Sequence, residues 1–364
     1  MLQTYSPAQY FVRGKGSFLY DDQGNEFLDF ASGISVCNLG HAHEAVTKAV
    51  AEQAATLVHI SNLYLNDVTP RLAEKLISKC FDGAVFFANS GAEANEGLIK
   101  LARKFGNATG RNEIISMENS FHGRTLATLA ATGRAKYRKG FEPDMPGFRQ
   151  VPYNDIEALK GAITDKTCAV LLEPVQGEGG ILPADPGYLK AVRALCDEKN
   201  LLLLFDEVQC GMGRIGTLYA WQSFGVQPDA FSMAKALANG LPMGAMVVSR
   251  KYCDLLKVGD HASTFGGTPL VSAAALAVQE VFEKENILDN CCKQGEYLMR
   301  ELGKLTRQYS FVKAVRGKGL MIGVVLDRPA GALSAAILKH NLITLTAGET
   351  VLRLLPPLTS SISR

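Results

Sequence analysis

Short apolar runs alternate with helix-like segments between about residues 84 and 250, and this alternation limits the possible folds. The runs occupy residues 84–88, 113–117, 169–172, 201–205, 230–233 and 245–248. Between several of them, as over 92–105 and 188–198, apolar residues recur at helical spacing. Strands that are apolar throughout and alternate with helices are typical of a largely parallel sheet with both faces covered. The sequence therefore predicts an α/β domain here.

The flanking segments predict a second, smaller unit. The expected elements are two strands around the turn at 22–24, helices at 42–58, 70–80, 270–283 and 294–305, and strands at 311–315, 320–326 and 342–345. We expect three parts: an N-terminal segment (1–45) that packs with the small domain, a large cofactor-binding domain (46–265), and a small α+β C-terminal domain (266–364).

Composition excludes several classes of function. The chain has 364 residues, 20% of them charged, with a formal net charge of +2, so nothing indicates a nucleic-acid or acidic membrane partner. The start of the sequence lacks a signal-peptide pattern, and no apolar run approaches the ~20 residues of a membrane helix. Eight scattered cysteines without a CxxC pair indicate free thiols and a cytoplasmic protein. The histidine spacing gives no metal site.

Two charged positions at strand ends suggest chemistry. The run 201–205 leads into Asp206 and Glu207, and the run 230–233 ends just before Lys235. Parallel strands would bring both ends to one edge of the sheet. A carboxylate and a partly desolvated amine suit pyridoxal phosphate (PLP), because the acid can pair with the ring nitrogen and the amine can attack the aldehyde. The alternative interpretation is a charged strand end and a lysine that reaches the surface.

The segment Asn89–Asn95 joins a strand to a helix. Ser90 and Glu93 have the spacing of a capping box, which would be purely structural. Gly91 and Ala92 would also let a ligand approach the helix N-terminus, where free N–H groups hold phosphate. The two interpretations are compatible.

Further candidates follow other strands. Phe121 precedes Gly123 and Arg124, so its ring could stack on a ligand while the arginine fork binds a carboxylate. Ser263 and Thr264 offer two hydroxyls before a glycine turn. Arg353 lies inside an apolar strand, which requires a carboxylate partner, either a ligand or an internal acid.

The residues 211–216 match the dinucleotide pattern GxGxxG. In a dinucleotide fold these glycines follow the first strand directly and open a helix. Here two acids and two further residues intervene, and no clear helix start follows. We therefore expect no NAD binding.

These motifs together resemble the class III aminotransferases of PLP fold type I, over residues from about 5 to 358. The resemblance implies that Lys235 forms the covalent link to PLP, that Asp206 pairs with the ring nitrogen, and that Gln209 lies near the ring hydroxyl. It also implies ring stacking by Phe121 and phosphate binding by the backbone of Gly91 and Ala92, with Ser90 nearby. It also implies a group of residues at the substrate: Arg124, Ser263, Arg353 and Glu178. Among these, Glu178 would be the acid that masks Arg353 in one half-reaction.

The same resemblance implies a homodimer in which Thr264 reaches the phosphate of the partner subunit's site. It implies transfer of an amino group from a small amine donor to 2-oxoglutarate. Segments 59–64 and 121–129 favour acetylornithine as the donor, and ornithine, succinyl-diaminopimelate and 4-aminobutyrate remain alternatives. A PLP aminomutase or decarboxylase, or a binding role without catalysis, also remains open. Family members continue past the segment 354–358 with a further helix, so we expect a truncated C-terminal domain.

Overall fold

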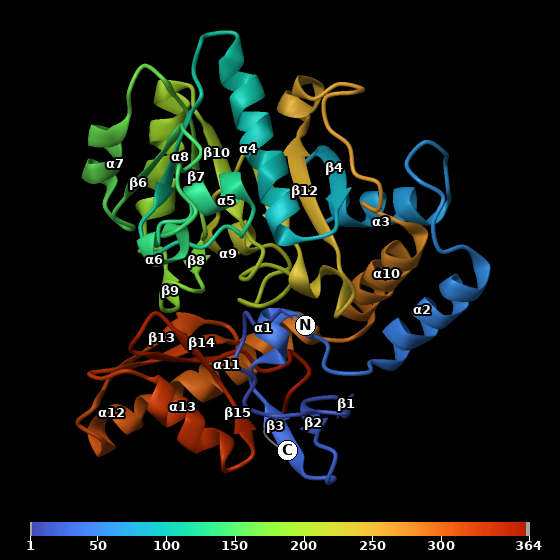
Figure 1. Ribbon diagram of the computed structural model, residues 1–364, viewed down its shortest axis with the longest axis vertical. Helices are drawn as coiled ribbons and strands as arrows, with labels where there is room; N and C mark the ends of the chain where they lie inside the picture. Colours follow the sequence, from blue (N-terminus) through green and yellow to red (C-terminus); the bar gives the residue numbers. More distant parts are fainter. Residues whose placement is uncertain (1, 362–364) are drawn as a thin grey trace.

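The structure, a computed structural model, describes residues 2–361. Met1 and residues 362–364, at the outer ends of the expected N-terminal segment and C-terminal domain, lie outside the described residues. A seven-stranded sheet forms the centre of the larger part (Figure 1). Its spatial order is β4 (Gly83–Ala88), β12 (Gly244–Ser249), β11 (Ala230–Met233), β10 (Leu202–Asp206), β7 (Thr167–Leu172), β5 (Glu113–Met117) and β6 (Phe148–Val151).

Six of these strands run parallel, and β12 runs antiparallel to both of its neighbours. The predicted mainly parallel sheet is therefore confirmed. All six apolar runs became strands. The strand β6, with the sequence Phe-Arg-Gln-Val, was not predicted, because it lies at the edge of the sheet and is only partly apolar.

Helices cover both faces of this sheet (Figure 1). The helices of the larger part are α2 (Glu44–Thr56), α3 (Val68–Ile77), α4 (Gly91–Asn107), α5 (Leu126–Ala131), α6 (Ala135–Arg138), α7 (Ile156–Ala162), α8 (Tyr188–Lys199), α9 (Ala220–Phe224) and α10 (Pro269–Lys284). Two 3₁₀ helices, η1 (Lys235–Ala238) and η2 (Arg250–Leu255), and the short pair β8 (Val175–Gln176) and β9 (Leu182–Pro183) complete it.

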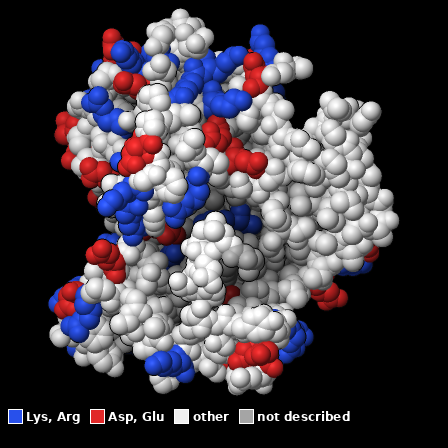
Figure 2. Space-filling model, in the orientation of Figure 1, with Lys and Arg blue, Asp and Glu red and all other residues white. Residues whose placement is uncertain are grey.

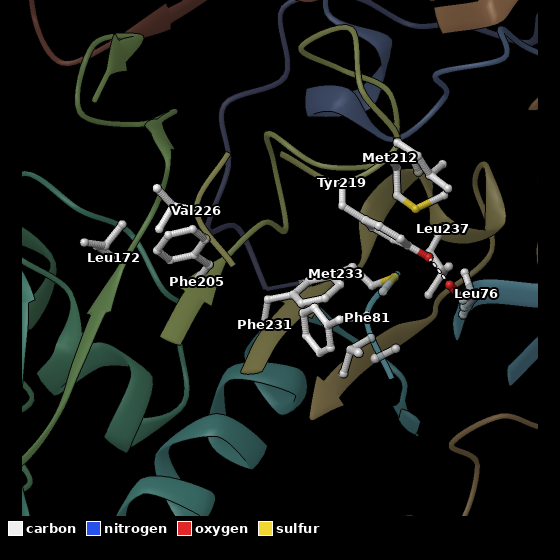
Figure 3. Close-up of a cluster of buried hydrophobic side chains, with 14 of the residues drawn as sticks. Leu76, Phe81, Leu172, Phe205, Met212, Tyr219, Val226, Phe231, Met233 and Leu237 are labelled. Atoms are coloured by element: carbon white, nitrogen blue, oxygen red, sulfur yellow. Dashed lines mark hydrogen bonds between the residues drawn. The ribbon is translucent and has the colours of Figure 1, made fainter. Parts of the chain in front are cut away.

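The central strands are buried on both faces, and their side chains divide by alternation. Leu203 and Phe205 belong to one hydrophobic cluster, which Figure 3 shows with Phe231 and Tyr219. Leu204 belongs to a second cluster on the opposite face. A strand with apolar residues at every position is stable only between two such layers, which is why the runs in the sequence are continuous.

The smaller part contains two four-stranded sheets. One has the order β13 (Val312–Lys318), β14 (Met321–Leu326), β17 (Val351–Leu354) and β16 (Leu345–Ala347). The other has the order β1 (Arg13–Lys15), β2 (Phe18–Tyr20), β3 (Glu26–Asp29) and β15 (Leu342–Ile343). The helices here are α1 (Ser32–Ser35), α11 (Ile287–Gly303), α12 (Leu305–Gln308) and α13 (Gly331–Leu338). The pairing of β3 with β15 joins the first strands of the chain to its last third (Figure 1).

Helix α10 lies against α2 and α3 and contributes to the same hydrophobic cluster as the large sheet. A boundary between residues 265 and 266 would separate this helix from the unit on which it packs. We therefore propose a division in which the large domain extends through α10.

Two further properties concern the chain as a whole. Across residues 2–361, no helix combines the length and the apolar character needed to cross a bilayer. All eight cysteines are free thiols, of which four are buried and four are half-buried or exposed.

Candidate active site

A cavity of about 430 Å³ lies where the parallel strands of the large sheet end. Eight of the predicted site residues line it: Ser90, Gly91, Ala92, Phe121, Arg124, Asp206, Gln209 and Lys235. They come from four separate loops, each following a strand or opening a helix. Figure 2 shows that the molecule is hollowed between its larger and smaller parts, with Lys and Arg side chains gathered beside the hollow.

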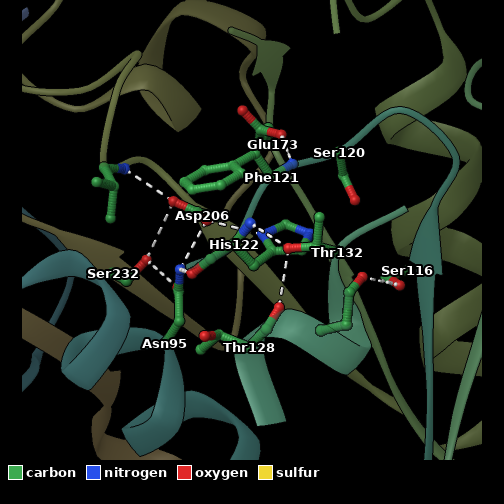
Figure 4. A network of polar contacts seen from close by, with 12 residues as sticks. Asn95, Ser116, Ser120, Phe121, His122, Thr128, Thr132, Glu173, Asp206 and Ser232 are labelled. Carbon is green, nitrogen blue, oxygen red and sulfur yellow. Dashed lines mark hydrogen bonds and ion pairs between the residues drawn. The ribbon is translucent and has the colours of Figure 1, made fainter. Parts of the chain in front are cut away.

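Asp206 is the centre of a buried hydrogen-bond network (Figure 4). One of its carboxylate oxygens, Oδ2, accepts from Asn95 Nδ2 at 2.7 Å and lies 2.7 Å from His122 Nδ1. The other, Oδ1, accepts from the Val208 N–H at 3.0 Å. Ser232 Oγ in turn donates to Asn95 Oδ1 at 2.6 Å. These contacts fix the carboxylate in one orientation at the cavity wall.

Two members of this network were not predicted. Asn95 lies one turn inside α4, and His122 follows the predicted Phe121, yet neither has a spacing that marks a partner of Asp206. Ser232 was recognisable only as a strand residue, although its alignment with Asp206 across β10 and β11 follows directly from their parallel pairing.

Lys235 follows β11 and begins the 3₁₀ helix η1. Its backbone φ is +49°, in the left-handed region that costs free energy for a side chain other than glycine. Burial lowers the pKa of its amine from 10.5 to about 8, despite the opposing effect of the Glu178 charge. A fraction of the amine is therefore unprotonated, and nucleophilic, near neutral pH.

The N-terminus of α4 forms another wall of the cavity. Ser90 Oγ accepts from the Glu93 N–H at 3.2 Å, as the capping pattern predicts. The Glu93 carboxylate accepts from the Asn89 N–H at 2.6 Å, so the second half of the motif is displaced by one residue. A Cβ at Gly91 would lie 2.7 Å from Val208 Cγ1, which explains the glycine. The first N–H groups of the helix remain available to an anion.

Phe121 and Arg124 lie in the loop after β5. The Phe121 N–H donates to Glu173 Oε1 at 3.0 Å, and Glu173 Oε2 accepts from the Gly177 N–H at 3.1 Å. Burial, together with the charge of Asp206, raises the pKa of the Glu173 carboxyl to about 7. Glu173 therefore ties the loop of Phe121 to the loop that precedes Glu178, a connection that the sequence did not reveal.

Arg353, in β17, forms an ion pair with Glu178. Its Nη1 also donates to Gln209 Oε1 at 3.0 Å. Burial raises the pKa of the Glu178 carboxyl, but the neighbouring Arg353 outweighs this effect and holds that pKa below its usual value. Glu178 and Arg353 are not among the residues that line the cavity, and Gln209 connects the two to it.

Ser263 and Thr264 lie outside this cavity. Ser263 Oγ accepts from the Gly266 N–H at 2.9 Å and from Asn89 Nδ2 at 3.3 Å, so it stands beside a cavity residue. Thr264 is exposed. The roles predicted for these two residues stay predictions.

The GxGxxG segment forms turns, and the next helix, α9, starts only at Ala220. Arg214 within it is fully buried and bonds four groups: Ser35 Oγ, Asn38 Oδ1 and the carbonyl oxygens of Leu320 and Pro356. Glu207, the acid that follows Asp206, accepts from the backbone N–H groups of Ala220 and Trp221. These residues therefore hold the fold together.

The cavity fits PLP on three counts. A buried carboxylate stands at one strand end for a ring nitrogen, a lysine with a lowered pKa stands at the next for an aldehyde, and a helix N-terminus offers N–H groups to a phosphate. The fold and this site together define a PLP-dependent enzyme of fold type I.

Comparison with known proteins gives the family. The model of the family "Aminotransferase class-III" matches residues 3–363. An acetylornithine aminotransferase from Methanocaldococcus jannaschii is 52% identical over 350 residues, which cover 95% of this chain and 88% of that protein. A succinylornithine transaminase/acetylornithine aminotransferase from Pseudomonas aeruginosa is 47% identical over 367 residues, covering 98% and 90%. This chain belongs to the class III aminotransferases.

A solved structure agrees with this assignment. The N-acetylornithine aminotransferase from Stenotrophomonas maltophilia superposes with a TM-score of 0.85 at 37% identity, covering 99% of this chain and 93% of that one. The predicted family, PLP fold type I, the cofactor and the transaminase class of activity are therefore confirmed.

Proposed function

We propose that this protein transfers the δ-amino group of N2-acetyl-L-ornithine to 2-oxoglutarate, giving N-acetyl-L-glutamate 5-semialdehyde and L-glutamate, a step of arginine biosynthesis. The observation that carries the proposal is the combination of Lys235 and Asp206 at adjacent strand ends with Arg124 and Arg353. Relatives named for acetylornithine, at about half of all positions identical, support the choice of donor.

Each residue of the Lys235–Asp206 pair has a separate task. PLP, when bound, supplies an electron-withdrawing ring that stabilises negative charge on the substrate carbon that loses a proton. With PLP bound, the carboxylate of Asp206 would pair with the ring nitrogen and keep a proton on it. Lys235 Nζ holds the cofactor between turnovers. Once released, the same amine takes the proton from the Cδ atom of acetylornithine and acts as the general base.

The two arginines divide the substrate carboxylates between them. Arg124 lines the cavity and offers its planar fork to the carboxylate of the amine donor. Arg353 is paired with Glu178, and this ion pair must open before Arg353 can bind 2-oxoglutarate. In this proposal Glu178 returns to Arg353 when acetylornithine is bound, so the same site accepts both substrates in turn. Ser263 contacts substrate from beside Asn89.

We also propose a homodimer in which Thr264 reaches the phosphate in the partner's site. The support is the exposure of Thr264 together with apolar side chains close to it. Phe265 is 59% exposed and stacks on His59, while Leu63, Tyr64 and Leu65 are all at least 70% exposed. Burial of such a group against a second copy would remove apolar surface from water. Location in the cytoplasm stays a prediction.

A panel of amine donors tests the function. Purified protein reconstituted with PLP is incubated with 2-oxoglutarate and acetylornithine, succinylornithine, ornithine, succinyl-diaminopimelate or 4-aminobutyrate, and glutamate formation is measured. We expect the highest kcat/KM for acetylornithine. Lys235→Ala should reduce turnover by about a thousandfold or more. An aminomutase or decarboxylase would form no glutamate, and a better donor than acetylornithine would replace our choice of substrate.

A further inference from the structure

Tyr137, in helix α6, lies among cationic side chains and contacts Arg124 and Phe121, both of which line the cavity. The guanidinium carbon of Arg124 is 4.3 Å from the centroid of the Tyr137 ring, that of Arg134 is 5.0 Å away, and Lys136 Nζ is 5.3 Å away. Phe121 contacts the same ring edge-on, with 5.8 Å between the centroids. One phenol ring is therefore in contact with three positive charges and the predicted stacking residue.

Arg124 depends on these rings for its position. Among the described residues, its close contacts are with the ring of Tyr137 and, at 5.5 Å, the ring of Phe121. It forms no ion pair with any described carboxylate. A guanidinium lying over an aromatic ring keeps its N–H donors directed sideways, in the plane of the fork. The ring thus determines the plane in which Arg124 can receive a carboxylate.

Tyr137 is itself fixed by Arg134. Arg134 Nη1 donates to Tyr137 Oη at 3.3 Å and to the carbonyl oxygen of Glu178 at 2.9 Å. Glu178 carries the carboxylate that pairs with Arg353. A continuous set of contacts therefore runs from Arg124 through the Tyr137 ring to the backbone of Glu178.

We infer that Tyr137 is a positioning residue for Arg124 and thereby selects amine donors that carry a carboxylate. This role of Tyr137 rests on the proposed function, because it takes acetylornithine as the amine donor. The three cations repel one another around one ring, and an incoming carboxylate relieves that repulsion. The ring stabilises the arrangement before the substrate arrives, so the cost of ordering Arg124 is met in the free enzyme.

A matched pair of donors tests the inference in the PLP-loaded enzyme. N-acetylputrescine is N2-acetylornithine without its carboxylate, so it reports every contact except the one assigned to Arg124. Tyr137→Leu is expected to raise the KM for acetylornithine about tenfold and to leave kcat within about twofold, because cation–π contacts of this kind contribute a few-fold to thirtyfold in affinity. The kinetics with N-acetylputrescine should stay within about twofold of wild type.

Two control variants separate the ring from its surroundings. Tyr137→Phe keeps the ring and should leave the KM for acetylornithine within about threefold. Lys139→Gln, which removes an exposed charge just after the same helix and away from the Tyr137 ring, should behave like wild type. Tyr137→Gln serves as a second ringless variant if the leucine variant does not fold. An unchanged KM for acetylornithine in a folded ringless variant would overturn the inference, and so would an equal rise for both donors.

A binding measurement keeps the inference separate from the proposed function. N-acetyl-L-norvaline has the carboxylate and acetyl group of acetylornithine but no δ-amine, so it cannot react. Calorimetry should show that Tyr137→Leu weakens its binding about tenfold relative to wild type. Absence of turnover with acetylornithine would refute the proposed function alone. Equal affinity of both proteins for N-acetyl-L-norvaline, or no binding by wild type, would refute the role of Tyr137.

Discussion

His122 Nδ1 lies 2.7 Å from Oδ2 of Asp206, and both side chains are buried. The same oxygen accepts from Asn95, so the carboxylate is held on one side by an imidazole and an amide. These contacts hold the buried carboxylate in one orientation. The ability of Asp206 to pair with a ring nitrogen therefore depends on residues that do not touch that nitrogen.

His122→Phe should lower kcat by about tenfold to a hundredfold, because a hydrogen bond to a charged group contributes roughly 1.5–3 kcal/mol. The affinity for PLP, measured by fluorescence titration, should fall by a smaller factor. His340→Phe, at an exposed site away from Asp206, is the matched control. A kcat within twofold of wild type in a folded His122→Phe protein would show that Asp206 needs no such support.

Lys235 makes the free energy of unfolding of the cofactor-free protein depend on pH in the alkaline range. Burial lowers its pKa from 10.5 to about 8. Between these values an unfolded lysine is still protonated while the folded one has lost its proton, so the free energy of unfolding rises with pH across this window. Below about pH 8 the cost of burying the charge is present in full.

Lys235→Met should therefore stabilise the cofactor-free protein at pH 7 by roughly 3 kcal/mol, as a pKa difference of this size implies. It should also flatten the rise in stability between pH 8 and 10.5. Urea unfolding at a series of pH values measures both effects. A steeper or unchanged slope in the variant would contradict the assignment of this rise to Lys235.

Glu178 controls whether Arg353 is available. Glu178→Gln removes the negative charge but keeps a hydrogen-bond acceptor beside the guanidinium. We expect glutamate to gain at least tenfold in kcat/KM relative to acetylornithine, because Arg353 no longer exchanges a protein carboxylate for a ligand carboxylate. Arg353→Gln should lower kcat/KM for 2-oxoglutarate by about a hundredfold. An unchanged preference between donors in Glu178→Gln would mean that the ion pair is only structural.

Arg214 should be one of the most sensitive positions for stability. It is fully buried, and its guanidinium joins Ser35 and Asn38 near the start of the chain to Leu320 and Pro356 near its end. Arg214→Met removes the donor of two buried carbonyls and one of the donors to Asn38 Oδ1, so the free energy of unfolding should fall by at least about 3 kcal/mol. Chemical denaturation measures the loss. Arg149→Met, at an exposed edge-strand position, should change stability by less than about 0.5 kcal/mol.

The large sheet was predictable because burial on both faces demands continuous apolar strands. The same reasoning predicted that Asp206 and Lys235 lie at neighbouring strand ends, and the parallel pairing of β10 and β11 places them there. The same reasoning failed at β6, an edge strand with polar positions. It also failed at 342–345, predicted as one strand, because β15 and β16 pair with different sheets on either side of Thr344.

The start of α11 was also missed. This helix begins at Ile287, seven residues before the predicted start, because its first turns present polar side chains to solvent. Buried Ile287 and Cys291, spaced four apart, were the available signal.

In the site, the partners of Asp206 were not predictable for a different reason. Their contacts depend on how α4 and the loop after β5 pack against each other in the folded protein. The spacing of residues along the sequence does not reveal that packing.

Thr264 allows a direct test of a shared active site. If it serves the partner's cavity, a dimer of one Lys235→Ala subunit and one Thr264→Glu subunit contains one intact site. That site combines the lysine of the second subunit with the threonine of the first. Each homodimer should be nearly inactive, since Thr264→Glu places a negative charge beside the phosphate.

Mixing the two inactive variants under conditions that exchange subunits should therefore restore activity, up to about one quarter of wild type when the subunits assort at random. A quarter is expected because half of the dimers are mixed and each has one working site of two. The control is a mixture of Lys235→Ala with a double variant that carries both changes, which has no intact site in any pairing. If Thr264 acts within its own subunit, the first mixture stays as inactive as the control.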